Sequence, residues 1–136
     1  KNLAKQLEIS QNVILTGKVP YDLIPTYYHL FNIMTSFSKT ETQGLTIIEG
    51  LASSLPVICI EDESFKTMVE HTYNGFLFKN QQEFIEFTNK LITNSKLYEA
   101  MQKNAKNSIY KYSKEVFGSE VLKVYAKAIK KRKTDL

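Results

Sequence analysis

Short apolar runs, separated by polar stretches, dominate the first 80 residues of the chain. Four such runs are rich in β-branched and aromatic side chains and are bounded by glycine, proline or polar residues, a pattern typical of buried strands. They cover residues 12–16, 33–37, 56–60 and 75–78. We therefore expect four short strands that are covered on both faces.

The segments between these runs carry helical signals. Residues 22–30 are expected to form a helix, because Pro25 is tolerated in a first turn, and a second helix is expected from residue 44 to about residue 53. Residues 61–74 are expected to be a loop with one short helical turn. This order of strands and helices predicts an α/β fold, with a Rossmann-like parallel sheet flanked by helices.

The last 55 or so residues are expected to form a helical C-terminal segment, because apolar side chains recur there at helical spacing. We interpret the three resulting stripes as core seams rather than a cofactor site. They are Phe84, Phe87 and Leu91; then Tyr98, Met101, Ala105 and Ile109; then Phe117, Val121, Val124 and Ala128.

Composition narrows the class of protein. The chain has 136 residues, 43% hydrophobic and 24% charged, which favours one globular domain over a disordered segment. No apolar run approaches the roughly 18 residues of a membrane span. The single cysteine, Cys59, lies in an apolar run, so we expect a buried thiol and a reducing compartment, the cytoplasm.

The formal net charge is +4, and residues 130–133 are all basic. Two interpretations of this basic end stay open: a solvated helix end, or a peripheral contact with anionic lipid at the inner face of the plasma membrane. Four charges without interleaved aromatics do not indicate nucleic-acid binding. His71 has no second histidine or cysteine at ligand spacing, so no metal site is expected.

Two glutamates stand out on either side of a predicted helix start. Glu41 falls in the loop after the second strand, and Glu49 falls on the second turn of the following helix. Between them, the free N–H groups of Gly44, Leu45 and Thr46 would form a helix N-terminus of the kind that binds phosphate. Alone the pair is weak evidence, since acidic residues are common near helix starts. It suggests a ligand with hydroxyls on both sides of a phosphate.

The residues around this pair resemble a known signature. Residues 38–58 are similar to the retaining glycosyltransferases of the glycogen-synthase and sucrose-synthase type, the group 1 glycosyl transferases of family 4, which have the two-domain GT-B fold. The shared features are the spacing of the two glutamates, Gly44-Leu45 and Pro56-Val57. Residues 12–20 and 74–78 resemble flanking segments of the same family. The sequence of residues 40–46 resembles that of the bacterial diacylglycerol glucosyltransferase branch.

The resemblance implies a role for each matching position. Glu41 is expected to hold hydroxyls of the donor sugar and to take part in catalysis, and Glu49 to bind the donor ribose. Backbone N–H groups at Gly44 and Leu45 are expected to face the sugar and the diphosphate. The remaining expected substrate-binding residues are Gln43, Thr46, and the base-contacting loop of Gly17, Lys18 and Val19.

The resemblance also implies what the chain is part of. Residues 1–136 are expected to be the nucleotide-sugar donor-binding domain, lacking its first strand–helix unit and the N-terminal acceptor domain. The whole enzyme is expected to transfer a glucose-type hexose from UDP to a lipid or glycan acceptor of the cell envelope. No metal or other cofactor is expected. The isolated fragment is expected to be inactive, because the family's phosphate-binding cations precede Lys1.

The sequence departs from the family at three places. Ser53-Ser54 stands where a small residue and a glycine are frequent, residues 61–65 replace a glycine-rich turn, and residues 71–73 replace a glycine-containing turn. Two alternatives stay open: a non-catalytic, glycosyltransferase-like partner subunit, and a module that binds a phosphorylated metabolite without transferring it.

Overall fold

A parallel sheet organises the chain, of which the computed structural model describes residues 1–39 and 44–134. Strands β1 (Met34–Ser36), β2 (Val57–Ile60) and β3 (Gly75–Phe78) lie side by side in that order. Met34 lies opposite Val57, which lies opposite Gly75 on its other side. The predicted α/β fold with a parallel sheet flanked by helices is confirmed.

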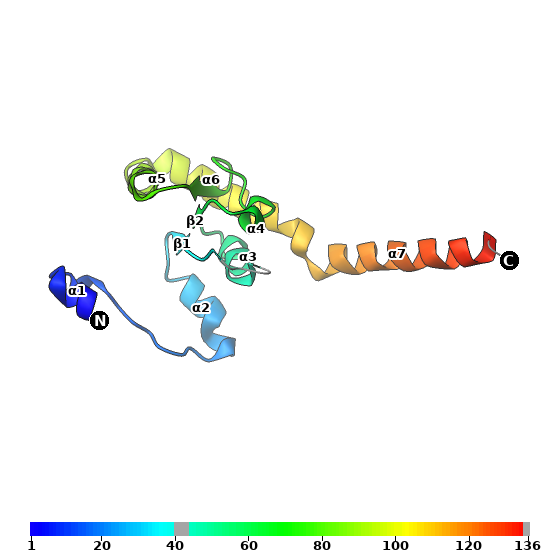
Figure 1. Cartoon of the computed structure of the whole chain (residues 1–136), viewed down its shortest axis with the longest axis horizontal. Helices are drawn as coiled ribbons and strands as arrows, with labels where there is room; N and C mark the ends of the chain where they lie inside the picture. The colour runs from blue at the N-terminus through cyan, green and yellow to red at the C-terminus, as the bar shows by residue number, and fades with distance from the viewer. Residues whose placement is uncertain (40–43, 135–136) are drawn as a thin grey trace.

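Helices connect and cover these strands (Figure 1). The first part of the chain contains α1 (Asn2–Gln6), the 3-10 turns Ser10–Asn12 and Tyr21–Leu23, and α2 (Ile24–Tyr28). Helix α3 (Leu45–Ala52) joins β1 to β2, and α4 (Glu63–Lys66) lies between β2 and β3. The C-terminal part contains α5 (Gln81–Thr93), α6 (Ser95–Ser108), the 3-10 turn Ile109–Tyr112 and α7 (Lys114–Thr134).

The central strand β2 divides the core into two layers, because successive side chains of a strand point to opposite faces. Val57 and Cys59 pack with Ile47 and Leu51 of α3, and with Phe65, in one cluster. On the other face, side chains of β2, β3, α5 and α6 form a second cluster: Ile58, Phe76, Phe78, Leu91 and Met101. Burial on both faces explains why the strands are apolar throughout rather than alternating.

Asn74 and Gly75 hold the start of β3 in place through hydrogen bonds and close packing with neighbouring segments. The Asn74 amide is 1% exposed; it donates to the Met68 carbonyl and to Ser108 Oγ, both at 2.9 Å, and accepts from the Glu70 N–H at 2.9 Å. A Cβ at position 75 would collide with the Val57 carbonyl oxygen, so only glycine fits there. The Asn-Gly pair that resembles the family motif therefore has a packing reason.

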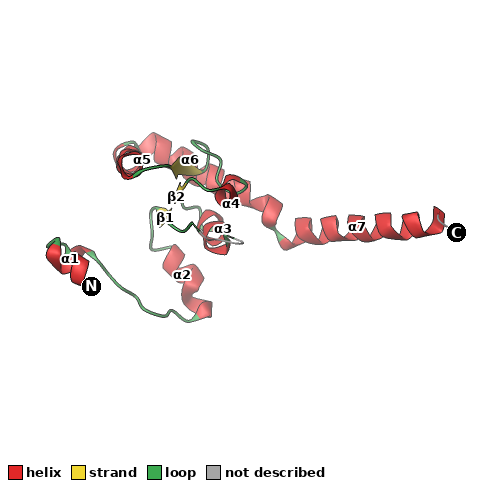
Figure 2. Cartoon of the chain, in the orientation of Figure 1, coloured by secondary structure: helices red, strands yellow, loops and turns green. Residues whose placement is uncertain are grey.

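Two expectations about buried segments are wrong. Residues 13–16 form no strand, and Ile14 is 87% exposed; Figure 2 shows this segment as loop. A strand needs a neighbour for its backbone groups, and none of the described strands lies beside it.

The third apolar stripe is not a core seam, because Phe117 and Val124 are 69% and 66% exposed on α7, which projects away from the sheet (Figure 1). The first two stripes do contribute buried side chains, through Leu91 and Met101.

Two non-glycine residues adopt left-handed backbone conformations in segments that depart from the family pattern. Ser54 has φ of 62° and Thr72 has φ of 68°. Both positions lie in segments where the sequence departs from the family it resembles. The β-branched side chain of Thr72 makes this conformation the more strained of the two.

Candidate functional site

A cavity of about 670 Å³ lies between α2, β1, α3 and the loop that contains Gly17. Its size falls within the range of about 300–1,000 Å³ that is typical of small-molecule pockets. Its wall combines aromatic and aliphatic side chains with a few polar groups. The lining residues used below are Gly17, Val19, Tyr28, Phe31, Thr46 and Glu49.

The Glu49 carboxylate is positioned by a neighbouring helix. Tyr28, at the end of α2, donates its hydroxyl to Glu49 Oε2 at 3.0 Å. The same hydroxyl oxygen lies 3.4 Å from the Thr46 carbonyl oxygen, one helical turn earlier on α3. Phe31 packs edge-on against the Tyr28 ring, with centroids 6.4 Å apart. The carboxylate is thus held at the cavity wall by a hydrogen bond to a charged acceptor, the stronger kind.

The environment of Tyr28 keeps its hydroxyl protonated. Desolvation by burial, followed by the hydrogen bond and the negative charge of Glu49, raises the pKa of Tyr28 to about 12. The phenol therefore remains a donor throughout the neutral and mildly alkaline range. Proton transfer from this tyrosine is disfavoured, so its role is to orient the carboxylate rather than to act as an acid.

Gly44 is the N-cap of helix α3 and has a left-handed φ of 58°, and no side chain caps this N-terminus. Gly44 is buried, and a Cβ there would collide with the end of the Met68 side chain. Leu45 and Thr46, the first two residues of the helix, are exposed. The first N–H groups of a helix have no partner within the helix, and such groups can bind an anion.

The structure brings most of the sequence-predicted residues to this region. Gly17, Val19, Thr46 and Glu49 line the same cavity, although Gly17 precedes Glu49 by 32 residues. Gly44 and Leu45 form the start of α3 beside it, and the Leu45 side chain is 57% exposed. Lys18 is exposed and does not line the cavity. Glu41 and Gln43 lie outside the described residues.

Sequence reasoning missed the aromatic wall. Tyr27, Tyr28 and Phe31 line the cavity, whereas no site residue was expected in this segment. The available signal was the concentration of aromatic side chains at helical spacing in a segment just before β1. It could not distinguish a site wall from a packing face, because the partner of Tyr28 lies 21 residues away.

No group of three histidine, cysteine, aspartate or glutamate side chains gathers within the described residues in a way that could hold a metal ion. In the same part of the chain, no helix is both long enough and apolar enough to cross a membrane.

Two curated bacterial proteins are similar to the chain along almost all of its length. The alpha-monoglucosyldiacylglycerol synthase of Acholeplasma laidlawii is 34% identical over 127 residues, which are 93% of this chain and 32% of that protein. The alpha-monoglucosyldiacylglycerol synthase of Streptococcus pneumoniae is 31% identical over 130 residues, 95% of this chain and 29% of that protein. The chain thus spans about a third of the length of these relatives, and the resemblance to the diacylglycerol glucosyltransferase branch is confirmed.

Solved structures share the fold. The Anabaena protein Alr3699/HepE, solved in complex with UDP and glucose, matches 93% of this chain and 35% of its own with a TM-score of 0.83 and 19% sequence identity. The architecture is that of the C-terminal domain of a GT-B glycosyltransferase. A family model described as "Glycosyl transferases group 1" matches residues 1–108. The chain belongs to the glycosyl transferases group 1 family.

Proposed function

We propose that the chain binds a nucleotide-sugar, a UDP-hexose of the glucose type, and is the donor-binding half of a retaining glycosyltransferase. The observation that carries this proposal is the Glu49 carboxylate, held by Tyr28 at the wall of a 670 Å³ cavity beside the start of α3. A carboxylate acceptor next to an uncapped helix N-terminus matches a ribose joined to a diphosphate.

Each part of the ligand has a matching surface. Glu49 Oε2 accepts from Tyr28, whereas Oε1 accepts no hydrogen bond from the described residues and is available to ribose hydroxyls. The diphosphate would lie against the first N–H groups of α3, from Gly44 onward. The base would lie against the loop of Gly17 and Val19 on the same cavity.

The identity of donor and acceptor rests on the relatives. HepE was solved with UDP and glucose, which supports a UDP-sugar. Two relatives named for glucosyldiacylglycerol synthesis support a lipid acceptor. We propose that the rest of the protein supplies the acceptor domain and the cations for the diphosphate, that Glu41 contacts the donor sugar, and that no metal is required. The enzyme would work in the cytoplasm, at the inner face of the plasma membrane.

Calorimetric titration with UDP and 2′-deoxy-UDP tests the ribose contact. We compare the wild-type chain, Glu49→Gln, and a matched control, Glu120→Gln, which removes a surface carboxylate paired with Lys123 on α7. Glu49→Gln should weaken UDP binding at least about tenfold, since hydrogen bonds to charged groups contribute about 1.5–3 kcal/mol. It should weaken 2′-deoxy-UDP binding less, because one hydroxyl partner is already missing.

Equal UDP affinity of the wild type and Glu49→Gln would refute the ribose role. If inorganic pyrophosphate binds as tightly as UDP to both proteins, the chain is a phosphometabolite-binding module instead. If UDP binding depends on Glu49 but the whole protein transfers no glucose, the chain belongs to a non-catalytic partner subunit. The 136 residues alone should show no turnover of UDP-glucose.

A further inference from the structure

A second cavity lies at the ends of all three strands. Lys39 follows β1, Glu61 follows β2 and Lys79 follows β3, and all three line an open cavity of about 470 Å³ together with Lys66 of α4. In open α/β sheets, ligands bind beyond the carboxyl ends of the parallel strands. The position of this cavity is therefore that of a ligand site rather than of an arbitrary surface hollow.

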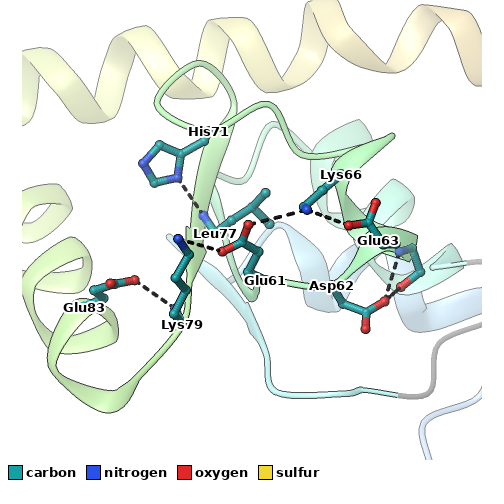
Figure 3. Close-up of polar contacts among 9 residues, drawn as sticks. Glu61, Asp62, Glu63, Lys66, His71, Leu77, Lys79 and Glu83 are labelled. Atoms are coloured by element: carbon teal, nitrogen blue, oxygen red, sulfur yellow. Dashed lines mark hydrogen bonds and ion pairs between the residues drawn. The ribbon is translucent and has the colours of Figure 1, made fainter.

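Glu61 is the central group of this cavity (Figure 3). Its backbone N–H donates to the Phe78 carbonyl at 2.7 Å, which fixes the residue between the ends of β2 and β3. Its side chain is 29% exposed; Oε1 lies 3.5 Å from Lys66 Nζ and Oε2 lies 3.4 Å from Lys79 Nζ. Two ammonium groups from different elements thus hold one half-buried carboxylate.

The hydrogen-bonding capacity of Glu61 is not used up by these contacts. Both ion-pair distances exceed the 2.7–3.2 Å of an ordinary N–H···O hydrogen bond. Lys66 makes its short contact, 2.6 Å, with Glu63 instead. A carboxylate accepts about four hydrogen bonds, so the Glu61 carboxylate has acceptor sites left for donors from a ligand.

The charges around the cavity select a neutral ligand. Its described lining contains three lysines and three carboxylates: Lys39, Lys66, Lys79, Glu61, Asp62 and Glu63. A phosphate would meet the carboxylates at close range, whereas a hydroxyl group donates to a carboxylate and accepts from an ammonium group. Alternating acceptors and donors of this kind match a compound with several neighbouring hydroxyls.

Helix α4, which carries Lys66, packs near the start of α3. A Cβ built on Gly44 would meet Met68, and Phe65 lies 3.9 Å from the same position. Phe65 directly precedes Lys66, so the helix that carries Lys66 packs against the helix N-terminus assigned above to the diphosphate. A sugar linked to that diphosphate could reach the cavity.

We infer that Glu61, held between Lys66 and Lys79, binds hydroxyls of a hexose and contributes to sugar specificity. This inference rests on the proposed function for the link to a nucleotide-sugar. The hexose is supplied either by the donor or by a glycosylated acceptor, and both sources present the same hydroxyl chemistry.

The test uses three probes: UDP, UDP-glucose and methyl α-D-glucoside. Their affinities are measured by calorimetry or NMR titration for the wild-type chain and for Glu61→Gln, which keeps the shape but removes the charge. Glu86→Gln is the matched control, because it removes a carboxylate paired with Lys90 at 2.7 Å on α5. Thermal melting checks that all three proteins fold equally well.

For a donor sugar, Glu61→Gln should leave UDP affinity within twofold and reduce the UDP-glucose to UDP affinity ratio about tenfold. If that ratio is unchanged but glucoside binding is lost, the inference holds with the acceptor as source. If the wild type binds glucoside through Glu61 but binds no UDP, the proposed function fails and the hexose site stands. An unchanged affinity ratio together with unchanged glucoside binding overturns the inference, as does a wild type that binds none of the probes.

Discussion

The hydroxyl of Tyr28 lies 3.0 Å from Oε2 of Glu49, and this hydrogen bond joins α2 to α3 at the wall of the larger cavity. Glu49 is therefore a carboxylate with one oxygen held by the protein and one available to a ligand. This geometry supports the proposed role of Glu49 in binding ribose hydroxyls.

Tyr28→Phe should weaken UDP binding about tenfold, because a hydrogen bond to a charged group contributes about 1.5–3 kcal/mol. The loss should shrink in a Glu49→Gln background, since the two residues act through the same contact. Calorimetry on the four proteins of this cycle measures the coupling. Tyr110→Phe is the control, because Tyr110 is 69% exposed on the C-terminal part. If the losses of UDP binding free energy in the two single variants add up to the loss in the double variant, Tyr28 does not act through Glu49.

Thr72→Gly should stabilise the fold by about 1 kcal/mol. Thr72 has φ of 68°, and a left-handed conformation costs a non-glycine residue about 1–2 kcal/mol, part of which the more flexible unfolded glycine chain offsets. Urea unfolding measures the difference. Thr67→Gly, at a residue with φ of −76°, is the matched comparison and should destabilise. A Thr72→Gly protein less stable than the wild type would show that the left-handed backbone at Thr72 does not destabilise the fold.

Asn74→Ala should destabilise the fold by about 3 kcal/mol, because it removes the partners of the buried Met68 carbonyl and of the partly buried Glu70 N–H group. Asn104→Ala removes a hydrogen bond to the Tyr73 carbonyl that is exposed to water, and should cost about 1 kcal/mol or less. Urea unfolding of both variants gives the comparison. Similar decreases in the free energy of unfolding for Asn74→Ala and Asn104→Ala would argue against a central role for the Asn74 contacts.

Cys59 should not react with a thiol reagent at pH 8 until the protein unfolds. Its side chain is 0% exposed, and desolvation by burial raises its thiol pKa from 9.0 to about 12. The absorbance change on reaction of the thiol reagent with Cys59, followed before and after addition of urea, measures this protection. A fast reaction of the folded protein would show that the cluster around β2 opens readily.

The Cys59 thiol should also make the free energy of unfolding decrease as the pH becomes alkaline. The folded state holds the Cys59 proton more tightly than the unfolded state, so its contribution is complete below about pH 9 and is lost as the pH rises towards 12. Tyr28 acts in the same direction from about pH 10, because its pKa is also raised, to about 12. Urea midpoints at pH 8 and pH 10.5 should therefore differ, and the difference should be smaller in Cys59→Ala.

Sequence patterns located three of the four expected strands to within about one residue, together with the helix after β1. Apolar runs such as residues 56–60 are reliable signals, because burial on both faces permits little else. The same reasoning failed for residues 12–16, where an equally apolar run has no described strand beside it. Apolar periodicity also could not show that Phe117 would be exposed on α7, because a stripe does not reveal what covers it.

The sequence by itself determined the fold class, the family signature around Glu49 and the position of the start of α3, because these depend on spacing along a few neighbouring turns. Only the tertiary structure decided that Tyr28 holds Glu49, that Asn74 satisfies buried groups of two other segments, and that Glu61 lies between Lys66 and Lys79. Such contacts join elements that are distant in sequence. Their geometry follows from how helices pack on the sheet, which no local pattern encodes.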